Sequence, residues 1–268
     1  MKAMVLQSPE TLVQGEIENP TIEAGNTLIK ITHSGVCGTD LKIYQGGIPV
    51  DYPRIMGHEM IGEVAEVGDA EGVEIGSRVI IDPVVYCGHC YQCQRGQTQL
   101  CPTGAIYGRD RDGGFTEYMQ TAADAIFPLP DNISGNTAPL LQVMTTCLHA
   151  QRLSDIFPGD SVVVLGLGVG GLLHVQLAKA RGAYPVIGIT RSPQRRELAE
   201  QLGADFTFAP DDDVDKKVLE LTNGVGADLV IESVGAVAVL EEAINLARIG
   251  GKLLLFGIYT STELQLSL

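Results

Sequence analysis

Ser161-Val162-Val163-Val164-Leu165-Gly166-Leu167-Gly168-Val169-Gly170-Gly171 is the stretch that decides the fold. The apolar run before Gly166 ends in glycines at 166, 168 and 171, and a helical pattern follows. This order fits the Gly-x-Gly-x-x-Gly fingerprint, in which glycines permit a tight turn, close approach of a diphosphate, and close packing of helix on strand. The stretch predicts a dinucleotide-binding loop made of Gly166, Leu167, Gly168, Val169, Gly170 and Gly171; a purely structural glycine turn is the alternative.

Further apolar runs follow this loop and are separated, for the most part, by helical patterns. They cover residues 186–189, 206–208, 229–231 and 253–256. Such alternation predicts an α/β fold with a doubly wound parallel sheet covered on both faces. Before residue 140 the chain instead shows short β-rich runs broken by Gly, Pro, Asn and Asp, which indicate an irregular, mostly β domain. We therefore expect two domains, residues 1–145 and 146–268.

The end of the second strand of the predicted parallel sheet bears on cofactor choice. An acidic residue there would bind the adenosine ribose hydroxyls, as in NAD-binding loops. This chain has Thr190, Arg191 and Ser192, with Arg195 and Arg196 soon after. Hydroxyl and guanidinium groups can bind a 2′-phosphate, so the sequence favours NADP over NAD. Alternatively, the arginines belong to a solvated helix face.

Four of the six cysteines lie within fifteen residues, as Cys87-x2-Cys90-x2-Cys93-x7-Cys101. Thiolates two residues apart can face one tetrahedral ion, and a fourth from a return loop closes the shell. The spacing predicts a structural zinc site in a lobe of about residues 87–101. An iron–sulfur cluster, unrelated thiols, or replacement of one cysteine by His89 are the alternatives.

The chain contains three further motifs: Gly35-Val36-Cys37-Gly38-Thr39-Asp40, Gly57-His58-Glu59 and Gly113-Gly114-Phe115-Thr116-Glu117-Tyr118. Together they resemble the zinc-dependent medium-chain alcohol dehydrogenases, particularly the sorbitol, threonine and glucose dehydrogenase-like branches, over essentially the whole chain. The resemblance implies an amino-terminal GroES-like catalytic domain and a Rossmann cofactor domain. It also implies hydride transfer between a secondary alcohol, polyol or sugar and NAD(P), with chemistry at a CH–OH group.

The resemblance also implies a catalytic zinc on Cys37 and His58, with the hydroxyl of Thr39 as proton relay. The family's third ligand position, often cysteine or a carboxylate, holds Gln142. A neutral amide leaves more of the cation's charge uncompensated, so we expect Glu59 to ligate the ion and Gln142 to lie at or near coordination. Asp40 either orients the metal shell or caps its loop. Family positions beside the nicotinamide match Thr146, Phe256 and Ile258.

Two other readings of the function are possible. A zinc-independent quinone or enone reductase could share the scaffold, but it would not need Cys37, His58 and Glu59 together. A catalytically silent nucleotide-binding protein is favoured only by the weak donor Gln142.

Composition limits the partners. The 268 residues include 33 acidic and 18 basic ones, for a net charge of −15, which argues against binding nucleic acid through its phosphates. The amino terminus lacks an apolar leader, and the longest apolar stretch, residues 162–173, is short of the ~20 residues that span a bilayer. We therefore expect a cytoplasmic enzyme with a small-molecule substrate and no membrane contact.

The chain ends at Leu268, soon after the fifth predicted strand. Compared with the family, this predicts a Rossmann domain that is incomplete at its carboxyl end. An exposed sheet edge favours pairing or aggregation. In the family the missing strand often builds the dimer, so a homo-oligomer is possible for a full-length form and is doubtful for this one.

Overall fold

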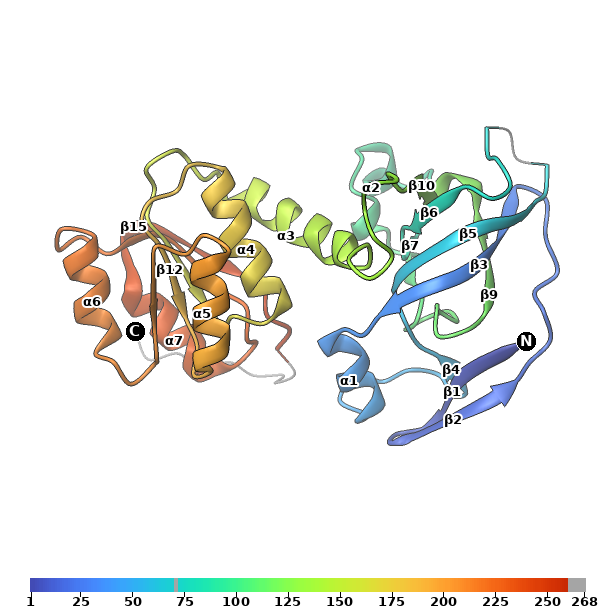
Figure 1. Ribbon diagram of the computed structural model, residues 1–268, viewed down its shortest axis with the longest axis horizontal. Helices are drawn as coiled ribbons and strands as arrows, with labels where there is room; N and C mark the ends of the chain where they lie inside the picture. The colour runs from blue at the N-terminus through green and yellow to red at the C-terminus, as the bar shows by residue number, and fades with distance from the viewer. Residues whose placement is uncertain (70–71, 260–268) are drawn as a thin grey trace. The chain divides into compact units, whose positions relative to one another are not determined.

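The computed structural model describes residues 1–69 and 72–259 (Figure 1). The chain divides into two compact units, Met1–Gln142 and a second that begins at Val143. Helix α3 (Leu140–Ser154) begins in the first unit and continues into the second. Each unit has its own core.

The first unit is mostly β. Its elements are β1 (Lys2–Ser8), β2 (Thr11–Glu16), β3 (Asn26–Gly35), α1 (Gly38–Tyr44), β4 (Arg54–Ile55), β5 (Glu59–Val67), β6 (Arg78–Ile81), β7 (Val84–Val85), α2 (Tyr91–Gln94), η1 (Thr98–Leu100), β8 (Ala105–Ile106), β9 (Tyr118–Ala122), η2 (Ala123–Ala125) and β10 (Ile126–Pro128). The largest sheet is antiparallel, in the order β10-β6-β5-β3-β9. A smaller sheet has the order β2-β1-β4, and β7 pairs with β8.

Apolar side chains of β3, β5, β6 and β9 form the main core of this unit. Its fully buried members include Ile29, Met60 and Ile81. Burial of side chains of this size stabilises a fold by roughly 1.5–3 kcal/mol each. The pairing of β3 with β5 places Gly35 opposite Glu59, at the end of both strands where the candidate metal ligands lie.

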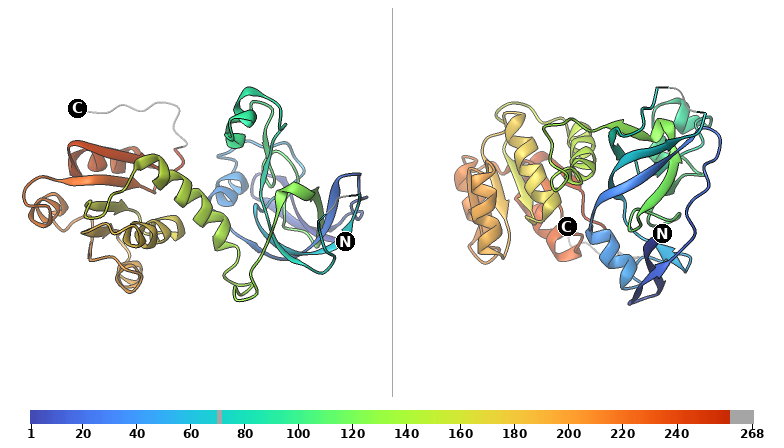
Figure 2. Two further views of the ribbon diagram at one scale, coloured as in Figure 1. Left: turned by 90° about the horizontal axis from the view of Figure 1, so that it is seen from above. Right: turned by 45° about the vertical axis from the view of Figure 1, so that its right-hand side comes forward.

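The second unit is a parallel sheet with helices on both faces (Figures 1 and 2). After α3 it contains β11 (Val162–Leu165), α4 (Val169–Ala180), β12 (Val186–Ile189), α5 (Pro193–Gln201), β13 (Phe206–Phe208), α6 (Val214–Leu221), β14 (Ala227–Glu232), α7 (Val237–Leu246) and β15 (Ala247–Leu255). The described strands have the order β13-β12-β11-β14-β15, and every pair is parallel. This order reverses direction between β11 and β14, where open α/β sheets bind ligands.

Alternation along the strands explains the two layers of helices. Val162 and Val164 of β11 pack in a cluster with side chains of α4 and α5, whereas Val163 and Leu165 pack with those of α6 and α7. A strand buried on both faces reads as a continuous apolar run, which is why the sequence identified it. The predicted doubly wound parallel sheet is confirmed.

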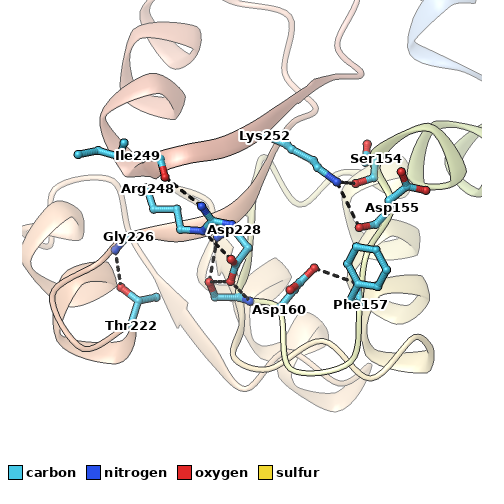
Figure 3. Close-up of polar contacts among 11 residues, drawn as sticks. Ser154, Asp155, Phe157, Asp160, Thr222, Gly226, Asp228, Arg248, Ile249 and Lys252 are labelled. Carbon is cyan, nitrogen blue, oxygen red and sulfur yellow. Dashed lines mark hydrogen bonds and ion pairs between the residues drawn. The ribbon is translucent and has the colours of Figure 1, made fainter.

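A polar network ties together the amino ends of β11, β14 and β15 (Figure 3). Asp228 accepts hydrogen bonds from the backbone N–H and hydroxyl of Ser161, at 2.8 and 2.7 Å, and from Nε of Arg248, at 2.7 Å. Nearby, Nζ of Lys252 donates to the carbonyl of Ser154 at the end of α3, at 2.7 Å. A cation there interacts favourably with the helix carbonyls. This network braces the edge of the sheet opposite the glycine-rich loop.

Strand β15 already begins at Ala247, so the apolar run 253–256 is only its end; the glycines at 250 and 251 hid the earlier part. The predicted early end of the sheet concerns residues 260–268, which lie outside the described residues. No helix within 1–69 and 72–259 is both long and apolar enough to cross a membrane.

Candidate metal centres and dinucleotide-binding loop

Cys37 lies between the end of β3 and the start of α1. It caps the helix in an extended conformation, with φ −90° and ψ 158°. Its backbone N–H donates to Oδ2 of Asp40, at 2.8 Å, which closes the first turn. Thr39 hydrogen-bonds the Cys37 sulfur through its hydroxyl and its backbone. The hydrogen bonds of Asp40 and Thr39 therefore position the thiol independently of a metal ion.

His58 and Glu59 follow a turn that requires glycine. Gly57 has φ +96°, and an added Cβ would lie 2.6 Å from the ring of Phe115. Gly35 faces Glu59 across the sheet, and a Cβ there would overlap with the Glu59 carboxylate. These two glycines leave room for the imidazole and the carboxylate beside the Cys37 thiol.

One ligand atom each from Cys37, His58 and Glu59 lies within 4.8 Å of the other two. Tetrahedral zinc with bonds of 2.0 to 2.3 Å places neighbouring ligand atoms about 3.3 to 3.8 Å apart, so a small adjustment closes the shell. Sulfur, nitrogen and carboxylate oxygen are all zinc donors. Three protein ligands and one remaining position are the arrangement of catalytic zinc sites.

The charges in this cluster depend on one another. Burial lowers the pKa of His58, but hydrogen bonds and charges from Asp40 and Cys37 outweigh burial and raise it to about 10. Burial raises the pKa of Cys37, yet hydrogen bonds from His58 and Thr39 lower it overall. Burial and the Asp40 charge raise the pKa of Glu59, against the opposing effects of His58 and Cys37. Without a metal, the cluster thus favours a thiolate beside an imidazolium, and a cation could replace the proton on His58.

The second cysteine cluster forms a closed shell of sulfur. The sulfur atoms of Cys87, Cys90, Cys93 and Cys101 all lie within 4.8 Å of one another. The Cys87–Cys93 and Cys90–Cys101 sulfur pairs are each 4.0 Å apart. Four Zn–S bonds of about 2.3 Å require sulfur–sulfur distances of about 3.8 Å, so this geometry fits zinc. The lobe could hold a structural ion with no open position.

The glycine-rich loop joins β11 to α4 in the second unit. Gly166 has φ +88°, and an added Cβ would lie 2.5 Å from Cγ2 of Val234. At Gly171 an added Cβ would overlap with the Gly166 carbonyl, whereas at Gly168 it would meet no atom within 4 Å. Gly168 caps α4, so the free space and the helix amino terminus suit a diphosphate.

Comparison with known proteins agrees with this geometry. Residues 23–131 match the model of the alcohol dehydrogenase GroES-like domain, and residues 168–268 match the zinc-binding dehydrogenase model. The chain is 39% identical over 250 residues to an L-threonine 3-dehydrogenase of Pyrococcus horikoshii, covering 91% of this chain and 72% of that protein. It is 33% identical over 274 residues to a sorbitol dehydrogenase of Bacillus subtilis, covering 100% of this chain and 78% of the relative.

A solved structure is similar over the whole chain. It is that of a Sinorhizobium meliloti protein described as a zinc-binding dehydrogenase bound to NADP, with a TM-score of 0.94 and 34% identity. The match covers 100% of this chain and 79% of that one. The chain belongs to the zinc-type medium-chain alcohol dehydrogenase family. Membership makes it an oxidoreductase, which confirms the expected family, enzyme class and GroES-like plus Rossmann fold.

Two other predicted site residues of this dehydrogenase lie on α3. Gln142, predicted as a fourth ligand, is half-buried in the first turn of α3. Thr146 is exposed on the same helix, with its hydroxyl donating to the Val143 carbonyl at 2.7 Å. Both roles stay predictions.

The predicted specificity residues of the dehydrogenase surround the amino end of α5. Ser192 caps this helix and accepts from the Arg195 backbone N–H at 3.4 Å, while the side chains of Arg191 and Arg195 are exposed. Arg196 instead donates to the carbonyl of Thr190, at 2.7 Å, and so supports the strand end. Arg191 and Arg195 are thus the guanidinium groups that a 2′-phosphate could use.

Phe256 and Ile258 directly follow β15. Phe256 is half-buried, with its ring 4.5 Å from that of His174 in an edge-to-face arrangement, and Ile258 is exposed. An added Cβ at Gly170 would lie 2.8 Å from Phe256, so this ring packs against the glycine-rich loop. Their predicted contacts with nicotinamide stay predictions.

Sequence reasoning missed Glu232, which is fully buried at the end of β14. An acidic residue directly after the apolar run 229–231 and before a Ser-Val-Gly turn was the available signal.

Proposed function

We propose that this dehydrogenase catalyses zinc-dependent hydride transfer between a secondary alcohol, polyol or sugar and NADP. The observation that carries the proposal is the cluster of Cys37, His58 and Glu59, with the buried carboxylate of Asp40 behind His58. A zinc-independent quinone or enone reductase would not require these three metal ligands.

The residues of the cluster fit a zinc ion. Cys37, His58 and Glu59 would hold it, and Gln142 would lie at or near coordination in exchange with water. Zinc bound there would act as a Lewis acid that polarises an alcohol or carbonyl oxygen. The thiolate and carboxylate would together offset the charge of the cation, which compensates for the neutral amide at position 142.

The surrounding side chains position the ligands and handle the proton. Asp40 Oδ1 lies 3.4 Å from Nδ1 of His58 and would orient the imidazole. Thr39 lies two residues after Cys37, in the first turn of α1, and its hydroxyl contacts the sulfur. A hydroxyl at that place can pass a proton from the reacting alcohol toward solvent.

The second unit would hold the dinucleotide. A diphosphate would bind the loop 166–171, and the adenosine 2′-phosphate would bind Thr190, Ser192, Arg191 and Arg195. A nicotinamide there would accept or donate the hydride. The NADP-bound relative from Sinorhizobium meliloti supports this cofactor, as does the lack of an acidic residue at Thr190.

Relatives support the class of substrate. Their names describe enzymes acting on threonine and sorbitol, both small molecules with a secondary alcohol. The lobe of Cys87, Cys90, Cys93 and Cys101 would hold a second zinc with a structural role. The cytoplasmic location and the oligomeric state stay predictions from sequence.

The test is a panel of polyols, aldoses and amino alcohols, each assayed with NADP and with NAD. We expect oxidation of at least one CH–OH substrate, faster with NADP, and its loss when a chelator removes the Cys37 metal. Activity that survives complete removal of that metal refutes the zinc mechanism. Binding of NADPH without turnover of any substrate would instead favour a silent nucleotide-binding protein.

A further inference from the structure

Glu232 is a carboxylate buried at the carboxyl end of β14. Its exposed fraction is 0%, and the residues before it, Leu229 to Ile231, are apolar. Burial of a carboxylate is costly unless donors surround it. A residue needed only for packing would be apolar, as its neighbours are.

Three donors satisfy the Glu232 side chain. Oε1 accepts from the backbone N–H groups of Val234 and Gly235, at 2.7 and 2.9 Å. Oε2 accepts from the hydroxyl of Tyr259, at 2.6 Å. Burial and the Glu232 carboxylate raise the pKa of Tyr259, so the phenol stays protonated and donates. One carboxylate thus joins the loop after β14 to the segment after β15.

The segment Phe256–Tyr259 is wrapped around the same residue. The backbone carbonyl of Glu232 accepts from the N–H groups of Phe256 and Gly257, at 2.8 and 2.9 Å. An added Cβ at Gly257 would lie 2.7 Å from Oε2 of Glu232. The path of this segment therefore depends on contacts with both the backbone carbonyl and the side-chain carboxylate of Glu232.

The loop after β14 also contacts the glycine-rich loop. The hydroxyl of Ser233 donates to the carbonyls of Leu165 and Gly166, at 2.9 and 2.7 Å. Glu232 therefore lies in a connected network that runs from the diphosphate-binding loop to Tyr259. All of these groups lie at the carboxyl edge of the parallel sheet, where such sheets bind ligands.

We propose that Glu232 is a positioning residue that, through Tyr259, holds the segment Phe256–Ile258 in the conformation that binds the nicotinamide end of the cofactor. This inference rests on the proposed function, because it assumes that the second unit binds NADP(H). Glu232 acts through the backbone and Tyr259, and it does not itself touch the reacting atoms.

The deciding variant is Tyr259→Phe, which removes one hydroxyl and leaves the ring. Two ligands are compared by calorimetry: NADPH, and 2′-phospho-ADP-ribose, which lacks only the nicotinamide. We expect the Kd for NADPH to rise about tenfold, as for loss of a hydrogen bond to a charged group, and the Kd for the fragment to stay within about twofold. The matched control is Tyr184→Phe, at an exposed tyrosine of the same unit, which should change neither value.

Glu232→Gln is the second variant, because it keeps the shape of the side chain and one acceptor oxygen. It should show the same selective loss of NADPH affinity, together with a lower kcat and an unchanged KM for the alcohol. Equal losses for NADPH and the fragment, or no loss for either in both variants, would overturn the inference. Failure of the wild-type enzyme to bind NADPH and NADH would instead be a failure of the proposed function.

Discussion

Oδ1 of Asp40 lies 3.4 Å from Nδ1 of His58, and Oδ2 of the same carboxylate accepts from the N–H of Cys37 at 2.8 Å. One buried side chain thus contacts two of the three residues that could hold the catalytic ion. Because Nδ1 faces Asp40, Nε2 is the imidazole nitrogen left for a metal. A carboxylate behind a histidine ligand fixes the ring and makes the other nitrogen a better donor.

Asp40→Asn should therefore weaken metal binding at this cluster by about 10- to 100-fold, because the amide loses the charge that favours His58 as a donor. Competition with a chelator of known affinity, followed by metal analysis, measures the change. Asp112→Asn is the control, since this exposed carboxylate of the same unit pairs with Arg54 instead. Unchanged metal affinity in the Asp40 variant would contradict the role assigned to this contact.

Cys93→Ser should remove one zinc per chain and lower the unfolding temperature, while the ion at Cys37 and His58 remains. The reason is that a structural site loses most of its affinity when one of four thiolates is absent, and its binding energy contributes to folding. Cys147→Ser is the matched control, because Cys147 is not one of the four lobe cysteines: it is buried in α3, and its thiol contacts the Gly170 carbonyl at 3.6 Å. If a single zinc binds in total, and only through the lobe, the two-zinc proposal is wrong.

Much of the fold could be predicted because the deciding signals are local. Strand β11 is buried on both faces and therefore reads as a continuous apolar run, and Gly166 to Gly171 follow it directly. The four cysteines of the lobe lie within one short loop, so their spacing alone brings their sulfur atoms together. In each case the residues that make the feature are close in sequence.

The candidate catalytic site could be predicted only through family resemblance. Cys37 and His58 meet because β3 pairs with β5 in a register that no local pattern specifies. The Glu232–Tyr259 contact spans 27 residues and depends on how two parallel strands end. Arg196 was a candidate for phosphate binding by charge alone, yet its guanidinium caps the end of β12 at Thr190. Charge and spacing do not reveal which backbone carbonyl a side chain contacts.

Cofactor choice should change in the Arg191→Ala/Arg195→Ala double variant. We expect the KM for NADP to rise about tenfold or more with little change for NAD, because charge-assisted contacts to the 2′-phosphate are lost. Steady-state kinetics with both cofactors measure the ratio. Arg196→Ala should instead affect the two cofactors equally, since it removes support from the Thr190 carbonyl. A double variant that keeps the wild-type NADP/NAD ratio would contradict the assignment.

Stability should fall in mild acid because of His174. This histidine is fully buried in α4, and burial lowers its pKa from 6.5 to about 4. Between pH 4 and 6.5 the unfolded chain binds a proton that the folded protein does not. The contribution of neutral His174 to the free energy of unfolding is therefore fully present above pH 6.5. It is lost as the pH falls toward 4, by up to about 1.4 kcal/mol per pH unit.

Denaturant unfolding at several pH values, compared between wild type and His174→Leu, isolates this contribution. The variant should show a shallower decline in the free energy of unfolding below pH 6.5. His149→Leu serves as the control, because His149 is exposed on α3. Parallel curves for wild type and the His174 variant would mean that this imidazole titrates normally.

Two glycines of the dinucleotide-binding loop, Gly168 and Gly171, should respond differently to replacement by alanine. At Gly171 a Cβ would overlap with the Gly166 carbonyl, so Gly171→Ala should lower the free energy of unfolding by about 1–3 kcal/mol, as for other overpacked sites.

At Gly168 the φ of −74° suits alanine, and an added Cβ would meet no atom within 4 Å, so Gly168→Ala should leave the unfolding temperature unchanged. Its methyl group would instead occupy the space that a diphosphate needs. We therefore expect Gly168→Ala to bind NADPH at least about tenfold more weakly while remaining folded. Calorimetric titration and thermal unfolding of both variants test this, and normal NADPH binding by the folded Gly168 variant would show that the loop has only a structural role.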